Sequence, residues 1–138
     1  MSADFVVDCS LTMAWCFADE TTPATYAIQE RLVTETALVP SLWFLEVANV
    51  LAIAERRKRL TPEKSARFIT LLHALNIEID DEAPRRAFAD LLPLCRAHAL
   101  TSYDAAYLEL AMRRALPIAS LDTGLRKSAK RVGVTILR

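Results

Sequence analysis

Phe5-Val6-Val7-Asp8-Cys9-Ser10 predicts a short buried β-strand that ends at a carboxylate. Phe5, Val6 and Val7 are the aromatic and β-branched types that strands favour, and the run is too short for a helix of its own. Ser10 is a residue type that caps helices, so we expect a short helix from there to about residue 18. Asp8 would then lie where a strand passes into a helix.

The same alternation of short apolar runs and helical segments continues along the chain. We expect further strands over residues 37–39, 77–79, 117–121 and 134–137. We expect helices over residues 22–35, 41–59, 61–75, 82–98, 101–115 and 122–131, with Ser41, Thr61 and Thr101 as N-caps. Pro93 predicts a break or kink, because proline has no N–H to donate inside a helix. This order predicts one α/β domain over residues 1–138, with a parallel sheet of about five short strands covered by helices on both faces.

The composition excludes several classes of function. The 138 residues are 53% hydrophobic and 25% charged, which suits a folded domain. The two glycines, Gly124 and Gly133, cannot form the three-glycine dinucleotide loop or the glycine-rich P-loop. Three cysteines without a C-x-x-C pair and two scattered histidines argue against a zinc cage and for a reducing compartment. We see neither a signal peptide nor an apolar run near the ~18 residues of a membrane span, and we expect a soluble cytoplasmic protein.

The formal net charge of zero conceals two basic segments. Residues 55–67 contain six bases and two acids, and residues 113–138 contain seven bases and one acid. One interpretation is a solvated helix end, where the helix dipole favours cations. The other is a surface that contacts phosphates, for which the candidate RNA contacts are Arg56, Arg57, Lys58, Arg59, Arg126 and Lys127.

Four acids occupy positions that invite a functional explanation. Asp8 and Asp122 each follow an expected strand, at the end where α/β sheets bind ligands. Glu46 has Leu42, Trp43 and Val50 as helical neighbours, and Asp104 lies in the first turn of its helix. Simpler explanations stay open, because Asp8 and Asp122 could cap helices, Asp104 could complete a capping box, and Glu46 could pair with an arginine.

Together the four acids indicate a site for a hard cation. Carboxylates that converge without cations repel one another and raise one another's pKa. Mg²⁺ or Mn²⁺ would relieve that repulsion, and an acid-only set without histidine or cysteine favours these ions over Zn²⁺. Such sites orient water and clamp phosphate oxygens during phosphodiester hydrolysis.

The order Asp8, Glu46, Asp104, Asp122 resembles the acidic quartet of PIN-domain ribonucleases. Asp8-Cys9-Ser10 is similar to the D-x-S of the family's opening strand, and Glu46-Val47-Ala48-Asn49 resembles the E-x-x-N helix of bacterial VapC toxins. Thr101-Ser102-Tyr103-Asp104-Ala105-Ala106-Tyr107 is close to the third motif, and Ser120-Leu121-Asp122 fits the [ST]-x-D of the fourth. The resemblance spans essentially the whole chain.

The resemblance implies a role for each of these residues. Asp8, Asp104 and Asp122 would hold Mg²⁺ or Mn²⁺, and Glu46 would complete the site directly or through water. Ser10 and Ser120 would hydrogen-bond the acids or the attacking water, and Asn49 would support the site. The family hydrolyses RNA, and VapC members are usually homodimeric toxins. A VapB antitoxin neutralises them by placing its C-terminal segment in the active groove.

Other interpretations stay open at this point. A PIN ribonuclease that is not a toxin, or a catalytically silent PIN-like interaction module, fits the same motifs. A phosphatase similar to the haloacid dehalogenases would need a second acid, where Asp8-Cys9-Ser10 has a serine, and a receiver-like domain would need adjacent acids on the first strand. Leu42-Trp43-Phe44-Leu45 makes one helix apolar nearly all round, so that helix belongs either to the core or to an interface.

Overall fold

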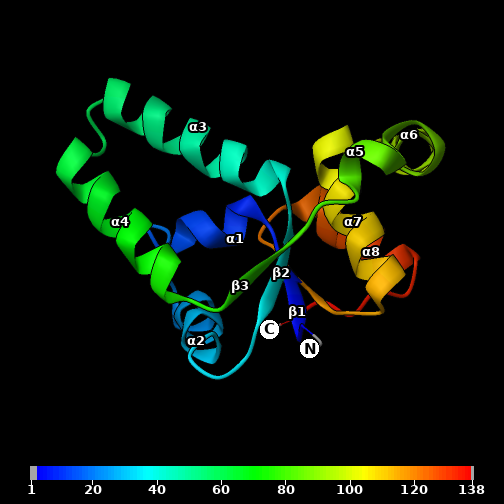
Figure 1. Ribbon diagram of the computed structural model, residues 1–138, viewed down its shortest axis with the longest axis horizontal. Coiled ribbons are helices and arrows are strands. Elements are labelled where there is room, and N and C mark those ends of the chain that lie inside the picture. Colours follow the sequence, from blue (N-terminus) through cyan, green and yellow to red (C-terminus); the bar gives the residue numbers. More distant parts are fainter. Residues whose placement is uncertain (1–2, 138) are drawn as a thin grey trace.

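A parallel β-sheet forms the centre of the computed structural model, which describes residues 3–137 (Figure 1). The strand order is β3-β2-β1-β4, and every neighbouring pair is parallel. Val6 pairs with Leu38 on one side and with Ile118 on the other. The strands are β1 (Phe5–Val7), β2 (Ala37–Pro40), β3 (Ile77–Asp80) and β4 (Ile118–Ala119).

The burial of the strands follows their place in the sheet. Every residue of β1 and β2 is buried, as expected for central strands that are covered on both faces. β3 is an edge strand, and its Glu78 and Ile79 are exposed. The carboxyl ends of all four strands lie at one edge of the sheet, where α/β proteins place their ligands.

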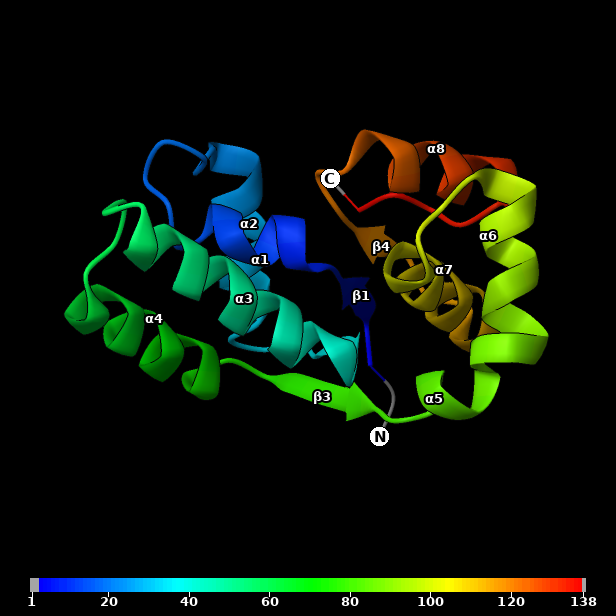
Figure 2. The same ribbon diagram turned by 90° about the horizontal axis from the view of Figure 1, so that it is seen from above.

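Helices cover both faces of the sheet, which confirms the predicted α/β architecture. Figures 1 and 2 show α1 to α4 on one side and α5 to α8 on the other. The first group is α1 (Cys9–Ala14), α2 (Pro23–Arg31), α3 (Leu42–Arg56) and α4 (Pro62–Ala74). The second group is α5 (Ala83–Arg86), the π-helical turn η1 (Ala87–Leu91), α6 (Leu92–His98), α7 (Ser102–Arg114) and α8 (Thr123–Arg131). Within residues 3–137, none of these helices combines the length and the apolar character needed to cross a membrane.

The predicted N-caps are right for two helices and wrong for two. Thr61 and Thr101 each accept a hydrogen bond from the backbone N–H three residues ahead, as predicted. Ser10 does not cap α1, because Asp8 precedes that helix in an extended conformation and accepts the Leu11 N–H instead. Ser41 makes no capping bond, since its backbone is already helical rather than extended.

The sheet has four strands rather than about five. The expected strand at residues 134–137 is reduced to a single parallel bridge between Ile118 and Ile136. The physical reason is the length of β4, which has only two residues and offers a further neighbour few pairing positions. Hydrogen bonds from Ile118 N–H to the Thr135 carbonyl and from Leu137 N–H to the Ile118 carbonyl hold the segment in place.

The expected helix over residues 82–98 is interrupted one turn before Pro93. In η1 the Leu92 N–H donates to the Ala87 carbonyl, five residues back, instead of following the α-helical spacing. Pro93 has no N–H to bond to the carbonyl four residues back, so the wider π-helical turn comes where α-helical bonding would fail anyway. The predicted break in the helix is therefore present, but it lies on the N-terminal side of Pro93.

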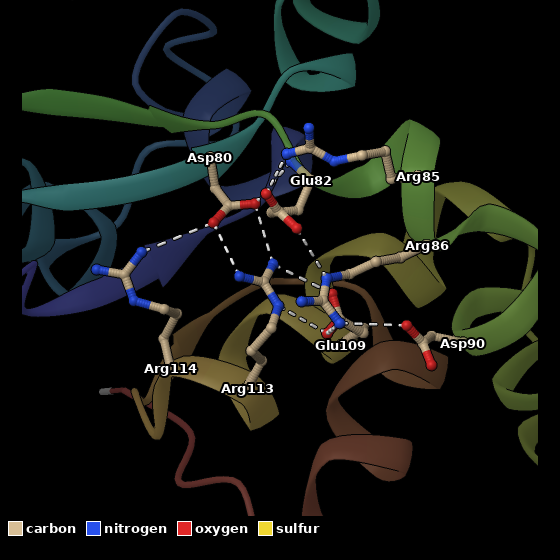
Figure 3. Close-up of polar contacts among 8 residues, drawn as sticks. All are labelled: Asp80, Glu82, Arg85, Arg86, Asp90, Glu109, Arg113 and Arg114. Carbon is tan, nitrogen blue, oxygen red and sulfur yellow. Dashed lines mark hydrogen bonds and ion pairs between the residues drawn. The ribbon is translucent and has the colours of Figure 1, made fainter.

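An ion-pair network joins the outer strand to the second group of helices (Figure 3). Asp80, the last residue of β3, accepts two 3.0 Å hydrogen bonds from the guanidinium of Arg113 on α7. Arg113 also contacts Glu109 at 2.8 Å, and Arg114 lies 3.6 Å from Asp80. These contacts hold the C-terminal end of α7, whose first turn carries Asp104.

Candidate active site

Asp8 is the buried centre of the candidate site. It follows β1, and its side chain accepts hydrogen bonds from Ser10 Oγ at 2.7 Å, Ser120 Oγ at 2.5 Å and the Leu11 backbone N–H at 2.9 Å. Burial raises its pKa, the bonds from Ser120, Leu11 and Ser10 oppose that change, and the charge of Asp122 adds to it, so the net direction is upward. A cation near Asp8 would therefore stabilise its ionised form.

Two serine hydroxyls join the end of β1 to the end of β4. The Leu121 N–H donates to Ser10 Oγ at 2.9 Å, and the Asp122 N–H donates to Ser120 Oγ at 3.0 Å. Each hydroxyl then donates its own hydrogen to Asp8. The structure thus gathers Asp8, Ser10, Ser120 and Asp122 into one hydrogen-bonded group.

Asp122 caps a helix and also belongs to this group. Its Oδ2 accepts the Leu125 N–H at 2.7 Å at the start of α8, as the capping interpretation expects. Its side chain is exposed, and its charge raises the pKa of both Asp8 and Asp104. One carboxylate oxygen satisfies the cap, and the other accepts no hydrogen bond from residues 3–137.

Glu46 reaches the site from α3 and is held by a tyrosine. Tyr107 on α7 is buried, and its hydroxyl donates to Glu46 Oε1 at 2.5 Å. No arginine or lysine pairs with Glu46 among residues 3–137, so the interpretation of a buried salt bridge is wrong. Burial raises the pKa of Glu46, the Tyr107 hydroxyl opposes it, and the charges of Asp104 and Asp8 raise it further.

Asp104 lies in the first turn of α7 but does not complete a capping box. Its backbone N–H donates to Thr101 Oγ1 at 3.1 Å, and its side chain makes no hydrogen bond within the described part of the chain. Its pKa rises from the ordinary 3.8 to about 6, through burial first and then through the charges of Asp122 and Asp8. The charges of neighbouring acids therefore raise the pKa of Asp8, Glu46 and Asp104, which places these side chains close to one another.

The donor chemistry of this group fits a hard divalent cation. The side chains offer carboxylate and hydroxyl oxygens, which are the ligands that Mg²⁺ and Mn²⁺ prefer. As the side chains stand in residues 3–137, no three acidic, cysteine or histidine groups are gathered closely enough to form a ligand cluster. Cys9 offers no alternative nucleophile, because burial, with the charges of Glu46 and Asp8, raises the pKa of its thiol to about 12.

The other predicted site residues lie in contrasting places. Asn49 is exposed on α3, and its side chain makes no hydrogen bond among the described residues. Arg126 adjoins the acids, because its Nη1 donates to the Ser120 carbonyl at 3.0 Å, and Lys127 follows it, exposed, on α8. Arg56 ends α3, ten residues or about 15 Å of helix beyond Glu46.

The basic segment after α3 divides into free and paired cations. Arg57 and Lys58 are exposed and form no ion pair in residues 3–137. Arg59 is held by Asp19 and Glu20, both at 2.9 Å. Its guanidinium also lies 3.7 Å from the centre of the Phe17 ring. Arg59 thus has a structural role, whereas Arg57 and Lys58 stay free at the far end of α3.

Tyr107 is the site residue that sequence reasoning missed. It was part of the third motif, but an aromatic residue on an apolar helix face looks like an ordinary core residue. The available indication was its spacing, because residues three apart share a helix face and Tyr107 follows Asp104 by three. A buried tyrosine also needs a partner for its hydroxyl, and a nearby carboxylate supplies one.

Comparison with known proteins agrees with this architecture. Residues 5–131 match the PIN domain family. A solved structure, PAE2754 from Pyrobaculum aerophilum, shares the fold with a TM-score of 0.72 at 20% sequence identity, over 98% of this chain and 84% of that one. No curated protein matches the sequence. Since the family match covers most of the chain, the chain belongs to the PIN domain family, whose members are generally nucleases.

Proposed function

We propose that this chain is a metal-dependent endoribonuclease that acts as the toxin of a type II toxin–antitoxin pair. The observation that carries the proposal is the meeting of Asp8, Ser10, Ser120 and Asp122 where β1 and β4 end, with Glu46 and Asp104 coupled to them. PIN domains typically use divalent metal ions, and this oxygen donor set fits them.

The contacts of each residue indicate its role in the proposed reaction. Asp8, Asp104 and Asp122 would hold Mg²⁺ or Mn²⁺, with Glu46 completing the set directly or through water. The bound ion would supply an activated water and charge compensation at the phosphate. Ser10 and Ser120 keep Asp8 oriented through their short hydrogen bonds, and Tyr107 does the same for Glu46. Asn49, which is exposed on α3, would support the site.

Cleavage of a mixed cellular RNA pool tests the nuclease proposal. We expect discrete cuts with Mg²⁺ or Mn²⁺, none with EDTA, and at least a hundredfold slower cutting by Asp104→Asn. Asp81→Asn is the matched control, since Asp81 is exposed and outside the site. If folded Asp104→Asn cuts at the wild-type rate, Asp104 has no part in the mechanism. If the wild type cuts in EDTA, the reaction does not need a metal ion.

The partners of the proposed toxin are a VapB-like antitoxin and a second copy of the chain. Two apolar side chains beside Glu46 support this, since Phe44 is 42% exposed and Leu45 is 75% exposed. Trp43 is buried instead, so the run at residues 42–45 is divided between core and surface. An apolar cavity of about 330 Å³ adjoins Phe44 between α3, α4 and β3. Exposed apolar surface of this kind is typical of interaction sites.

Two experiments test these partners. Light scattering at high protein concentration should show a dimer, and a monomer at every concentration would exclude it. Expression of the chain should stop growth, and co-expression of a small neighbouring reading frame should restore it. A chain that cleaves RNA but leaves growth unchanged is a PIN ribonuclease without a toxin role. A chain that neither cleaves RNA nor binds Mn²⁺ at millimolar concentration is a silent interaction module.

A further inference from the structure

The exposed side of α8 is a cationic surface directly beside the acidic site. Leu125, Ser128 and Ala129 form the buried side of this nine-residue helix. Its four cations are Arg126, Lys127, Lys130 and Arg131, and the helix itself contains no acid. None of the four forms an ion pair with an acid in residues 3–137. Four unpaired cations on one short helix attract a polyanion more strongly than a balanced surface does.

Arg126 connects this surface to the acids. Its Nη1 donates to the carbonyl of Ser120, whose hydroxyl donates to Asp8. A guanidinium has five N–H donors, and this contact uses one of them. The remaining donors form no hydrogen bond within residues 3–137, and arginine suits a phosphate because it can bind two of its oxygens at once.

A shallow cleft of about 360 Å³ marks where a ligand would lie. It is lined by Leu121, Thr123, Arg126, Lys127 and Lys130. The lining therefore contains three cations, a hydroxyl and one exposed apolar side chain. Phosphate oxygens match the cations and the hydroxyl, because arginine, lysine and threonine side chains all bind the phosphates of a nucleic-acid backbone.

The other basic segment differs in both distance and pairing. Arg56 lies three helical turns beyond Glu46, and Arg59 is already paired with Asp19 and Glu20. A chain bound in the acidic site would meet the cations of α8 first, because Leu121 and Thr123, which flank Asp122, line the same cleft as these cations. It would reach the end of α3 only by following that helix outward.

We propose that the exposed side of α8 is the subsite for the RNA backbone next to the scissile phosphodiester, with Arg126, Lys127 and Lys130 as its phosphate contacts. The RNA nature of the ligand rests on the proposed function, while the position of the subsite rests on the contacts above. The cations at the end of α3 then lie outside the bound RNA.

Binding of a fluorescein-labelled, mixed-sequence single-stranded RNA in EDTA tests the subsite without cleavage. The triple variant Arg126→Ala/Lys127→Ala/Lys130→Ala is compared with Arg56→Ala/Arg57→Ala/Lys58→Ala, which removes the same number of charges. We expect the α8 variant to bind at least about tenfold more weakly at low salt. The slope of log affinity against log salt concentration should become shallower by about 2, because each of the three lost phosphate contacts contributes about 0.7 on a single strand. The α3 variant should bind within twofold of wild type.

Equal losses in the two triple variants, or a larger loss in the α3 variant, would overturn the subsite. If a triple variant fails to fold, the single charge reversals Lys127→Glu and Arg57→Glu give the same comparison. Cleavage by the wild type in Mn²⁺ is measured separately on the same RNA. If only the α8 variant loses binding and the wild type does not cleave, the subsite is supported and the nuclease proposal is rejected. If the wild type cleaves and the two variants bind equally, the nuclease proposal is supported and the subsite is rejected.

Discussion

Asp104 shows how a carboxylate of the candidate site costs stability. Its pKa rises from 3.8 to about 6, so the folded chain holds the proton more tightly than the unfolded chain does. Its contribution to the free energy of unfolding is therefore greatest below pH 3.8 and is lost as the pH rises through about 6. At neutral pH the ionised group destabilises the metal-free fold, which is common for active-site acids.

Asp104→Asn should accordingly stabilise the metal-free protein at pH 7.5. We expect a gain of about 1 kcal/mol, kept small because the side chain is partly exposed and water screens its charge. For a domain of this size the thermal midpoint should rise by about 3 °C. Thermal unfolding in EDTA at several pH values measures the change in the midpoint, and the gain should disappear below pH 3.8. An equal gain at pH 3 and pH 7.5 would show that ionisation is not its cause.

Tyr107→Phe removes the hydrogen bond that holds Glu46 and keeps the ring in the core. On the proposed metal site, we expect the affinity for Mn²⁺ to fall about tenfold, since groups that orient metal ligands typically have effects of 10–100-fold. Titration calorimetry measures the change. Tyr103→Phe is the control on the same helix, because Tyr103 is 59% exposed. Affinities within twofold of each other for the two variants would contradict a positioning role for Tyr107.

At the scale of helices and strands, the sequence predicted the elements well and their ends less well. The two central strands and the helix after residue 61 follow local patterns of apolar residues and capping threonines. The strand at residues 134–137 depended on a partner strand whose length no local pattern reveals. Ser10 and Asp8 are both capping types, and only the extended backbone at Asp8 decides between them.

The candidate site was also predictable only in part. Asp8 and Asp122 are recognisable because each follows a strand, and parallel strands end at one edge of a sheet. The bond between Tyr107 and Glu46 was not, since it joins residues 61 positions apart on separate helices. The separation of the two basic segments likewise depends on the direction in which α3 leaves the sheet (Figure 1).

Ala115 ends α7 in a conformation that favours glycine. Its φ of 53° lies in the left-handed region, which costs a residue with a Cβ about 1–2 kcal/mol. Ala115→Gly relieves that strain but makes the unfolded chain more flexible, which costs about 0.4–1 kcal/mol. We expect a net gain of about 0.5–1 kcal/mol in the free energy of unfolding, measured by urea denaturation.

The control for Ala115→Gly is the same change inside a helix. Ala66 is exposed in α4 and has helical backbone, so Ala66→Gly should lower the free energy of unfolding by about 1 kcal/mol. Opposite signs at the two positions attribute the gain to the left-handed cap. Loss of stability at both positions would mean that α7 does not end in this conformation in solution.

At the scale of the whole molecule, the sheet divides the chain into two groups of helices that share one site. Glu46 and Asn49 come from the first group, Asp104 and Tyr107 come from the second, and Asp8 lies between them. The relative position of the two groups therefore sets the geometry of the site. The Asp80–Arg113 ion pair is one of the contacts across this division, since it joins the edge strand β3 to α7 (Figure 3).

Asp80→Asn tests how much this ion pair stabilises the molecule. Burial raises the pKa of Asp80, but Arg113, the Glu82 N–H and Arg114 outweigh it, so the pKa lies below 3.8. A lowered pKa means that the stabilisation is present above pH 3.8 and is lost as the pH falls through the folded-state value. We expect a loss of about 2 kcal/mol in the free energy of unfolding at pH 7 that shrinks towards zero in acid.

The control is Asp81→Asn, at the exposed neighbouring residue, which should change the free energy of unfolding by less than about 0.5 kcal/mol. Urea denaturation of both variants between pH 2.5 and pH 7 separates the effects, and an Asp80→Asn loss that persists at the lowest pH would assign it to packing rather than to charge.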